Sequence, residues 1–207
     1  MIRHLLRWPL QRRNHIWTAI GIAMSLVSCS TSFDMSGERL TPLGAEWGVV
    51  IGSVLVQPEK AASGEYATRR DSDDLTYEFN IVQSSPGDAD GESPYAERYY
   101  LHAKAGEERI FISRLRSGQY LMRSFSQARV TGIGGELDLI FASMAGEVRY
   151  VGRLLVEIPQ HVSRGKGYRF TVQNARESTL QQISHHHADL VKQALDVPMQ
   201  ARARPVP

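Results

Sequence analysis

Apolar and polar residues along the middle of this chain follow the two-residue period of β-strands. The stretch WGVVIGSVLVQ, residues 47–57, is apolar on both faces and rich in valine, which predicts a buried strand that ends at Pro58. LTYEFNIVQ, residues 75–83, alternates strictly, and its apolar face holds Leu75, Tyr77, Phe79 and Ile81. Such alternation indicates a strand with one face in the core and the other in solvent.

Six further stretches of this kind follow at short intervals: RYYLHAK, ERIFISRL, QYLMRSF, ELDLIFASM, EVRYVGRLLVEI and YRFTVQN. Turn signals separate them, including RSG between the second and the third. The longest stretch is expected to turn one row of residues inward: Val148, Tyr150, Leu154, Val156 and Ile158. About eight short strands joined by turns predict a mainly β chain, a single antiparallel β-sandwich, with a small β-barrel as the alternative.

One helix is predicted near the carboxyl end, over residues 175–195, where apolar residues such as Leu180, Ile183 and Leu190 recur at helical spacing. We expect this helix to pack on the sandwich or to cap its open end. The remaining stretch, VPMQARARPVP at residues 197–207, has three prolines and no periodicity, which predicts a disordered tail.

The amino-terminal segment has a different pattern. Its first 13 residues contain four arginines, and no acidic residue occurs before Asp34. An apolar, uncharged run of 13 residues follows, at 16–28, and leads to Cys29 and a small polar stretch. This order is typical of a secretory signal peptide, since a membrane-spanning helix needs about 20 apolar residues. An uncleaved single-span anchor is the less favoured alternative.

The four residues that end this run, Leu26-Val27-Ser28-Cys29, resemble the lipobox of bacterial lipoproteins. The resemblance implies that the Cys29 sulfur receives a diacylglycerol and that a peptidase cuts just before it. It further implies an outer-membrane location, because Ser30 stands where an aspartate would favour retention in the inner membrane. An ordinary secreted protein with a free cysteine is the alternative. The expected division is a signal peptide over 1–28, a lipidated tether over 29–46, a sandwich with its helix over 47–196 and the tail over 197–207.

Cleavage before Cys29 would change the charge of the chain. The full sequence has 24 basic and 22 acidic residues, and the first 28 residues include four of the basic ones and none of the acidic ones. The formal net charge therefore moves from +2 to −2, which offers no electrostatic case for binding nucleic acid. Cys29 is the only cysteine, so the fold must be stable without a disulfide within the chain.

A second, shorter resemblance covers residues 107–158. The stretch ERIFISRLRSGQYLMRSF is similar to the strand, turn and strand of transthyretin-like and carboxypeptidase-regulatory-like sandwiches, with Ser117-Gly118 in place of the usual Pro-Gly. MAGEVRYVGRLLVEI resembles the hairpin that follows in lipoproteins of this shape. The resemblance implies a non-catalytic binding or structural module without a cofactor.

Residues that could carry chemistry are few. The HHH run at 185–187 is the strongest candidate, and His185 and Asp189 have the i, i+4 spacing of helical metal ligands, with His186 beside them. A nucleophile elbow of the G-x-S-x-G type is absent. The acidic DADGE run lacks the later ligands of a calcium loop.

We therefore expect a lipid-anchored envelope protein that faces the periplasm and is not an enzyme. Its partners are expected to be the membrane, through lipid on Cys29, and an envelope protein that the sequence does not identify. The alternative function is a periplasmic metal-binding protein that uses His185, His186 and Asp189.

Overall fold

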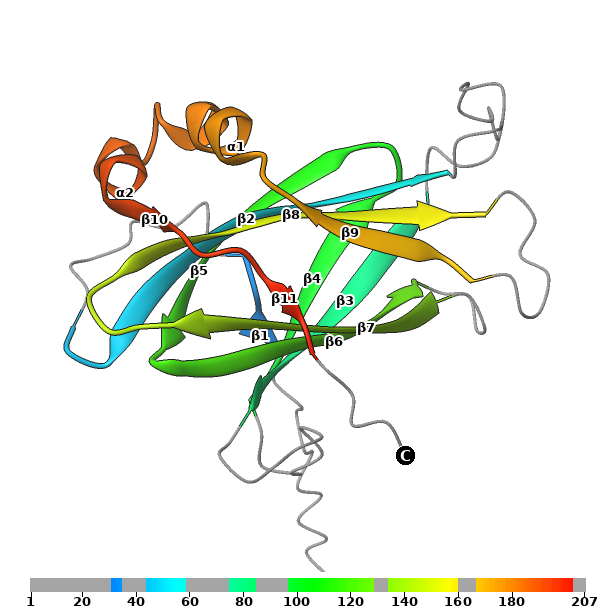
Figure 1. The fold of residues 1–207 in the computed structure, drawn as a ribbon, viewed down its shortest axis with the longest axis horizontal. Helices are drawn as coiled ribbons and strands as arrows, with labels where there is room; N and C mark the ends of the chain where they lie inside the picture. Colours follow the sequence, from blue (N-terminus) through cyan, green and yellow to red (C-terminus); the bar gives the residue numbers. More distant parts are fainter. Residues whose placement is uncertain are drawn as a thin grey trace, which may run out of the picture.

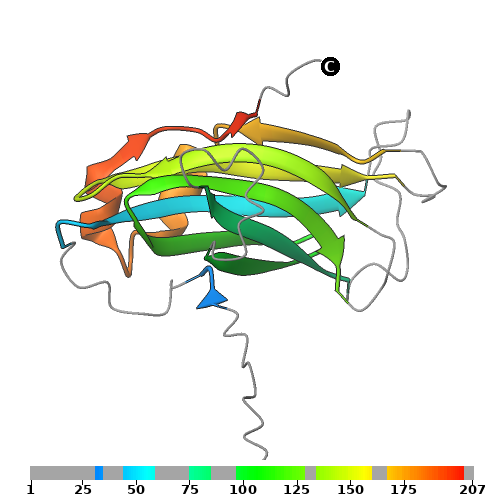
Figure 2. The same ribbon diagram turned by 90° about the horizontal axis from the view of Figure 1, so that it is seen from below.

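The computed structural model of the chain describes residues 31–34, 44–58, 75–84, 97–128, 134–159 and 167–202. Cys29 and the predicted signal peptide lie outside these residues. The described strands form two sheets that face each other (Figures 1 and 2). Sheet A has the order β1 (Thr31–Ser32), β4 (Arg98–Lys104), β3 (Thr76–Ser84), β6 (Gly118–Gln127), β7 (Gly134–Ser143) and β11 (Gln200–Ala201).

Sheet B has the order β10 (Ala194–Asp196), β8 (Val148–Ile158), β2 (Trp47–Pro58) and β5 (Glu108–Arg116), and β9 (Arg169–Gln173) pairs with the second half of β8. Two short helices, α1 (Arg176–Ile183) and α2 (Ala188–Gln193), follow β9. The predicted mainly β sandwich is confirmed, and strands β2 to β9 correspond to the eight predicted stretches. Most pairs are antiparallel, but β2 and β8, at the centre of sheet B, run parallel.

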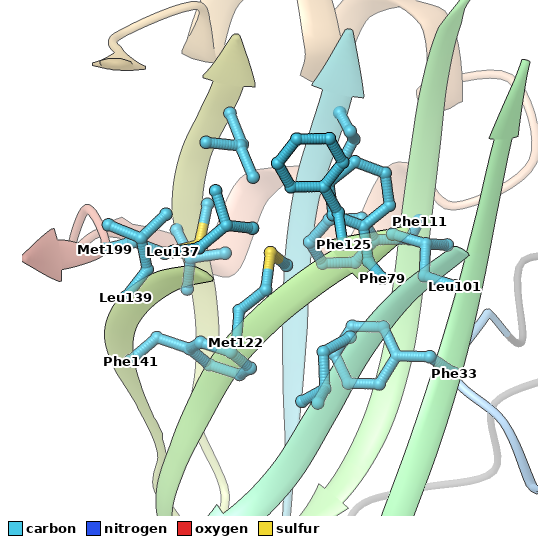
Figure 3. Close-up of a cluster of buried hydrophobic side chains, with 14 of the residues drawn as sticks. Phe33, Phe79, Leu101, Phe111, Met122, Phe125, Leu137, Leu139, Phe141 and Met199 are labelled. Carbon is cyan, nitrogen blue, oxygen red and sulfur yellow. The ribbon is translucent and has the colours of Figure 1, made fainter. Parts of the chain in front are cut away.

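The main core lies between the two sheets, where the alternating strands point their apolar rows (Figure 3). In β3, Tyr77, Phe79 and Ile81 are buried there, as their spacing predicts. Leu101 of β4 and Leu139 of β7 join them from neighbouring strands. Period-two alternation therefore assigned the inner face of sheet A correctly, because side chains of a strand point alternately to opposite faces.

Strand β2 is apolar on both faces because sheet B is covered on both sides. Its inner residues, such as Val50 and Val54, belong to the main core. Val49 and Ile51 lie on the other face, in a second cluster with Leu180 and other apolar residues of the helical segment. Figure 1 shows α1 and α2 gathered at one end of sheet B, beside β2, β8 and β10. The prediction that a helical segment packs on the sandwich is thus confirmed.

Strand β8 departs from its predicted pattern at Gly152. Val148 and Tyr150 belong to the second cluster, under the helices, whereas Leu154 and Val156 face the main core. The register against β2 shifts between Ile51 and Ser53, so β8 carries one extra residue there, and Gly152 has a φ of +93°. A bulge of this kind reverses which side chains face inward, and the single inward row predicted for β8 is wrong in its first half.

The two turns assigned to hairpins join strands of different sheets. Ser117 leads from β5 in sheet B to β6 in sheet A, and residues 144–147 lead from β7 in sheet A to β8 in sheet B. The strands of the transthyretin-like resemblance are present, but the described strand pairs join neither β5 to β6 nor β7 to β8. A glycine-containing turn reverses the chain whether or not the flanking strands pair, which is why its sequence does not distinguish the two arrangements.

The carboxyl-terminal segment also differs from its prediction. The single predicted helix is two helices with a turn at 184–186, and α2 begins after His187. The first part of the predicted tail is ordered: β10 pairs with β8, β11 pairs with β7, and Met199 between them is only 3% exposed. Residues 197–202 therefore close one edge of the sandwich, while 203–207 lie outside the described residues.

Candidate functional site

The residues that follow the proposed lipidation site form a clip, Thr31–Asp34, across the opposite edge of the sandwich. Thr31 and Ser32 form β1, which runs parallel to β4 and pairs with Tyr99 and Tyr100. The Phe33 amide continues this ladder by donating a hydrogen bond to the Tyr100 carbonyl at 3.1 Å. The clip thereby covers the outer edge of sheet A, whose backbone groups would otherwise be open to another strand.

The same clip binds the edge strand of sheet B. The Ser113 hydroxyl donates to the Phe33 carbonyl, and the Ile112 amide donates to Asp34 Oδ1 at 3.3 Å. The Arg109 guanidinium forms an ion pair with the Asp34 carboxylate. Four consecutive residues therefore join β4 of one sheet to β5 of the other. Figure 2 shows β1 at this edge of the two layers.

Phe33 gives the clip its apolar contact with the core. Its side chain is 1% exposed and reaches between the sheets, toward the cluster drawn in Figure 3. The centroid of its ring lies 5.2 Å from that of Phe111, 5.9 Å from Tyr99 and 6.2 Å from Phe141. These are the separations of favourable aromatic pairs, so Phe33 belongs to the core although it precedes the predicted domain boundary.

The position of the clip shortens the expected tether. Cys29 precedes Phe33 by four residues, and an extended chain spans at most about 3.5 Å per residue, so Cys29 lies within about 14 Å of the Phe33 backbone. The prediction of a free tether over 29–46 is wrong for residues 31–34. A lipid on Cys29 would hold this edge of the sandwich directly against the membrane.

Two buried phenols lie next to the clip at the same end of the sheets. The Tyr99 hydroxyl donates to the Glu97 carboxylate at 2.6 Å, and the Tyr120 hydroxyl donates to the Arg116 carbonyl at 3.0 Å. Burial, with the nearby negative charge of Glu97, raises the pKa of Tyr120 to about 12. Burial and the hydrogen bond to Glu97 raise the pKa of Tyr99 as well. Both phenols therefore stay neutral at physiological pH and act as hydrogen-bond donors.

An aromatic and cationic surface lies just beyond the clip. We call it the end patch and define it as Trp47, Arg114, Arg116 and Met144. The guanidinium carbons of Arg114 and Arg116 lie 5.1 and 5.5 Å from the Trp47 ring centroid, within the range of cation–π contact. Trp47 opposes Arg116 across the β2–β5 pair. Met144 stands in the β7–β8 turn, whose Gly146 amide donates to the Trp47 carbonyl at 2.9 Å.

The histidine run does not form a helical pair of ligands. His185 and His186 are exposed and lie in the turn between the helices, while Asp189 is exposed on α2. The break removes the i, i+4 relation on which the metal hypothesis depends. Among the described residues, no group of three or more histidine, cysteine, aspartate or glutamate side chains is placed to hold a metal ion.

A polar cluster lies on sheet B beside the start of α1. Arg153 binds Glu108 through two hydrogen bonds of 2.8 Å, and its guanidinium also lies 3.3 Å from the Ser178 hydroxyl. An open pocket of about 570 Å³ adjoins it, lined by Asn174, Ala175, Arg176, Glu177, Ser178 and Gln181. The ion pair ties β8 to β5 across β2, which is a structural role.

Sequence patterns did not single out the clip or the end patch. Phe33 is an isolated apolar residue in a polar stretch, and Trp47 reads as the first residue of a buried strand. Within the described residues, neither helix is long and apolar enough to cross a membrane. No protein-family model, curated protein or solved structure matches this chain.

Proposed function

We propose that this chain is a bacterial lipoprotein, anchored in the outer membrane through lipid on Cys29, that holds its β-sandwich in the periplasm as a non-catalytic binding or structural module. The observation that carries the proposal is the lipobox Leu26-Val27-Ser28-Cys29 at the end of a basic and then apolar leader. Two or three acyl chains on one residue anchor a protein stably, whereas a single chain holds it only marginally.

The position of the clip supports a mature chain that starts at Cys29. The first described residues after the cysteine already pair with β4, and Phe33 is buried in the core. A peptidase cut before Cys29 would leave this contact intact and would remove only residues ahead of it. The folded part of the chain thus begins immediately after the proposed anchor.

Metabolic labelling tests the anchor. Cells that express the chain are grown with labelled palmitate, beside a Cys29→Ser variant, and the mature mass is measured. We expect label on the first chain only, and a mass that lacks residues 1–28. A cleaved, soluble and unlabelled product would refute the proposal and leave an ordinary secreted protein, and an uncleaved chain would indicate a single-span anchor.

A second variant tests the membrane assignment. Ser30→Asp keeps Cys29 and the core, but places an aspartate directly after the cysteine. We expect this variant to incorporate palmitate as before and to move from the outer-membrane to the inner-membrane fraction. If the unchanged chain already fractionates with the inner membrane, the outer-membrane part of the proposal is wrong.

A further inference from the structure

We propose that the end patch rests on the membrane and binds the anionic headgroups of the leaflet that holds the Cys29 lipid. This inference rests on the proposed lipid anchor. It adds to it a lipid-binding surface on the folded domain, with Trp47 and Met144 as the apolar contacts and Arg114 and Arg116 as the ligands for phosphate groups.

The path of the clip places the anchor on the side of the end patch. Phe33 contacts Ser113, and Asp34 contacts Ile112 and then Arg109, so the clip runs antiparallel to β5. Residues that precede Phe33 must therefore lie toward the other end of β5, where Arg114 and Arg116 stand. With Cys29 only four residues before Phe33, a membrane that holds its acyl chains also lies close to this end of sheet B.

The side chains of the patch suit an anionic interface. Arg116 is exposed, and Trp47 and Arg114 are partly exposed. Tryptophan and arginine are favoured at the level of the headgroups, where an apolar body and a polar or charged tip can both be satisfied. Met144 is 43% exposed, and within the described residues only Leu195 matches it as an exposed large apolar side chain.

The acidic groups nearest the patch leave its positive charge largely uncompensated. Asp34 pairs with Arg109, and Glu147 receives a hydrogen bond of 2.8 Å from Arg149. The Glu97 carboxylate accepts the Tyr99 hydroxyl. Glu46, exposed next to Trp47, is the carboxylate of the described residues that opposes the two arginines along the chain. The patch therefore attracts negative lipid although the mature chain as a whole is slightly acidic.

The mature chain contains its own reporter for this contact. The sequence has three tryptophans, and two of them, Trp8 and Trp17, lie in the segment that cleavage removes. Trp47 is then the sole tryptophan, so the intrinsic fluorescence of the lipidated protein reports on the patch alone. Vesicles that carry a quencher on the lipid near the headgroup will show whether Trp47 touches the bilayer.

The test uses the mature lipidated protein, whose lipid mass is verified first, in vesicles of neutral phosphatidylcholine with or without anionic phosphatidylglycerol. We expect lipid-borne quenching of Trp47 with phosphatidylglycerol, weaker quenching without it and weaker quenching at high salt. Arg116→Glu should lower the ratio of membrane-facing to free patch at least about fivefold, since each arginine contributes roughly that factor near an anionic surface. Arg169→Glu, the same charge reversal at an exposed position of β9, should leave the quenching unchanged.

Three results would overturn the inference. These are no quenching in either vesicle, quenching that ignores phosphatidylglycerol and salt, or an equal effect of the two charge reversals. A protein without the lipid mass would instead refute the proposed anchor, so the two failures are distinguishable on one sample.

Discussion

Removal of the Phe33 side chain tests whether the clip is part of the fold in solution. Phe33 is 1% exposed and its ring meets three other aromatic rings in the core. Truncation of a buried phenylalanine to alanine costs about 3–5 kcal/mol, because transfer and cavity terms add. The clip is a terminal segment that can detach, which limits the loss to its docking energy. We therefore expect Phe33→Ala to lower the free energy of unfolding by about 3 kcal/mol, the lower end of that range.

The measurement is urea unfolding of the mature chain, followed by far-ultraviolet circular dichroism. For a chain of this length, 1 kcal/mol corresponds to a shift of about 2–4 °C in Tm, so a thermal melt should fall by about 6–12 °C. Phe33→Leu keeps most of the apolar volume and should cost only about 1 kcal/mol. Leu195→Ala, at a side chain that is 50% exposed, should change stability by less than about 0.5 kcal/mol.

A loss below about 1 kcal/mol for Phe33→Ala would refute this reasoning, because that value is typical of a residue outside the core. Phe33 would then not be buried in solution, and the short distance between the sandwich and Cys29 would no longer hold. The argument that places the end patch near the membrane would lose its geometric basis at the same time.

Two further predictions concern the bulge and the buried phenols. Gly152→Ala should lower Tm more than Gly106→Ala: both glycines have positive φ, which costs a side chain of order 1 kcal/mol, but only at Gly152 would the new Cβ meet a neighbour, Val172, at 2.8 Å. Equal shifts would show that the bulge has room for a side chain. Because burial raises the pKa of Tyr120 to about 12 from about 10 in the unfolded chain, the stability it contributes is complete below pH 10 and is lost as the pH rises to 12. Tyrosinate absorbance should therefore show Tyr120 ionising only above the exposed tyrosines; ionisation with them near pH 10 would contradict its burial.

Local patterns predicted most of the strands and their inner faces. The rows of β3, β4 and β7 that alternate in the sequence are the rows that face the core. The prediction fails at Gly152, where one extra residue in β8 reverses the faces. A bulge is defined by the partner strand it opposes, so the glycine alone does not announce it.

The candidate site was predicted only in part. The lipobox is a contiguous motif and can be read without a fold, whereas the clip depends on contacts of Phe33 and Asp34 with residues about 70 to 80 positions away. The end patch likewise combines residues of β2, β5 and the β7–β8 turn. The histidine run was overvalued, since its ligand spacing assumed a continuous helix that ends at Ile183.

By itself, then, the sequence determined the strand-rich character of the chain, the apolar rows of most strands and the leader that ends at Cys29, because each depends on residues within one short stretch. Tertiary structure decided how the strands pair, where β8 changes faces and how both termini close the edges of the sandwich. Those features depend on which distant strand edges and apolar surfaces remain uncovered. A short segment such as Thr31–Asp34 or Val197–Arg202 pairs with them only once the two sheets have come together.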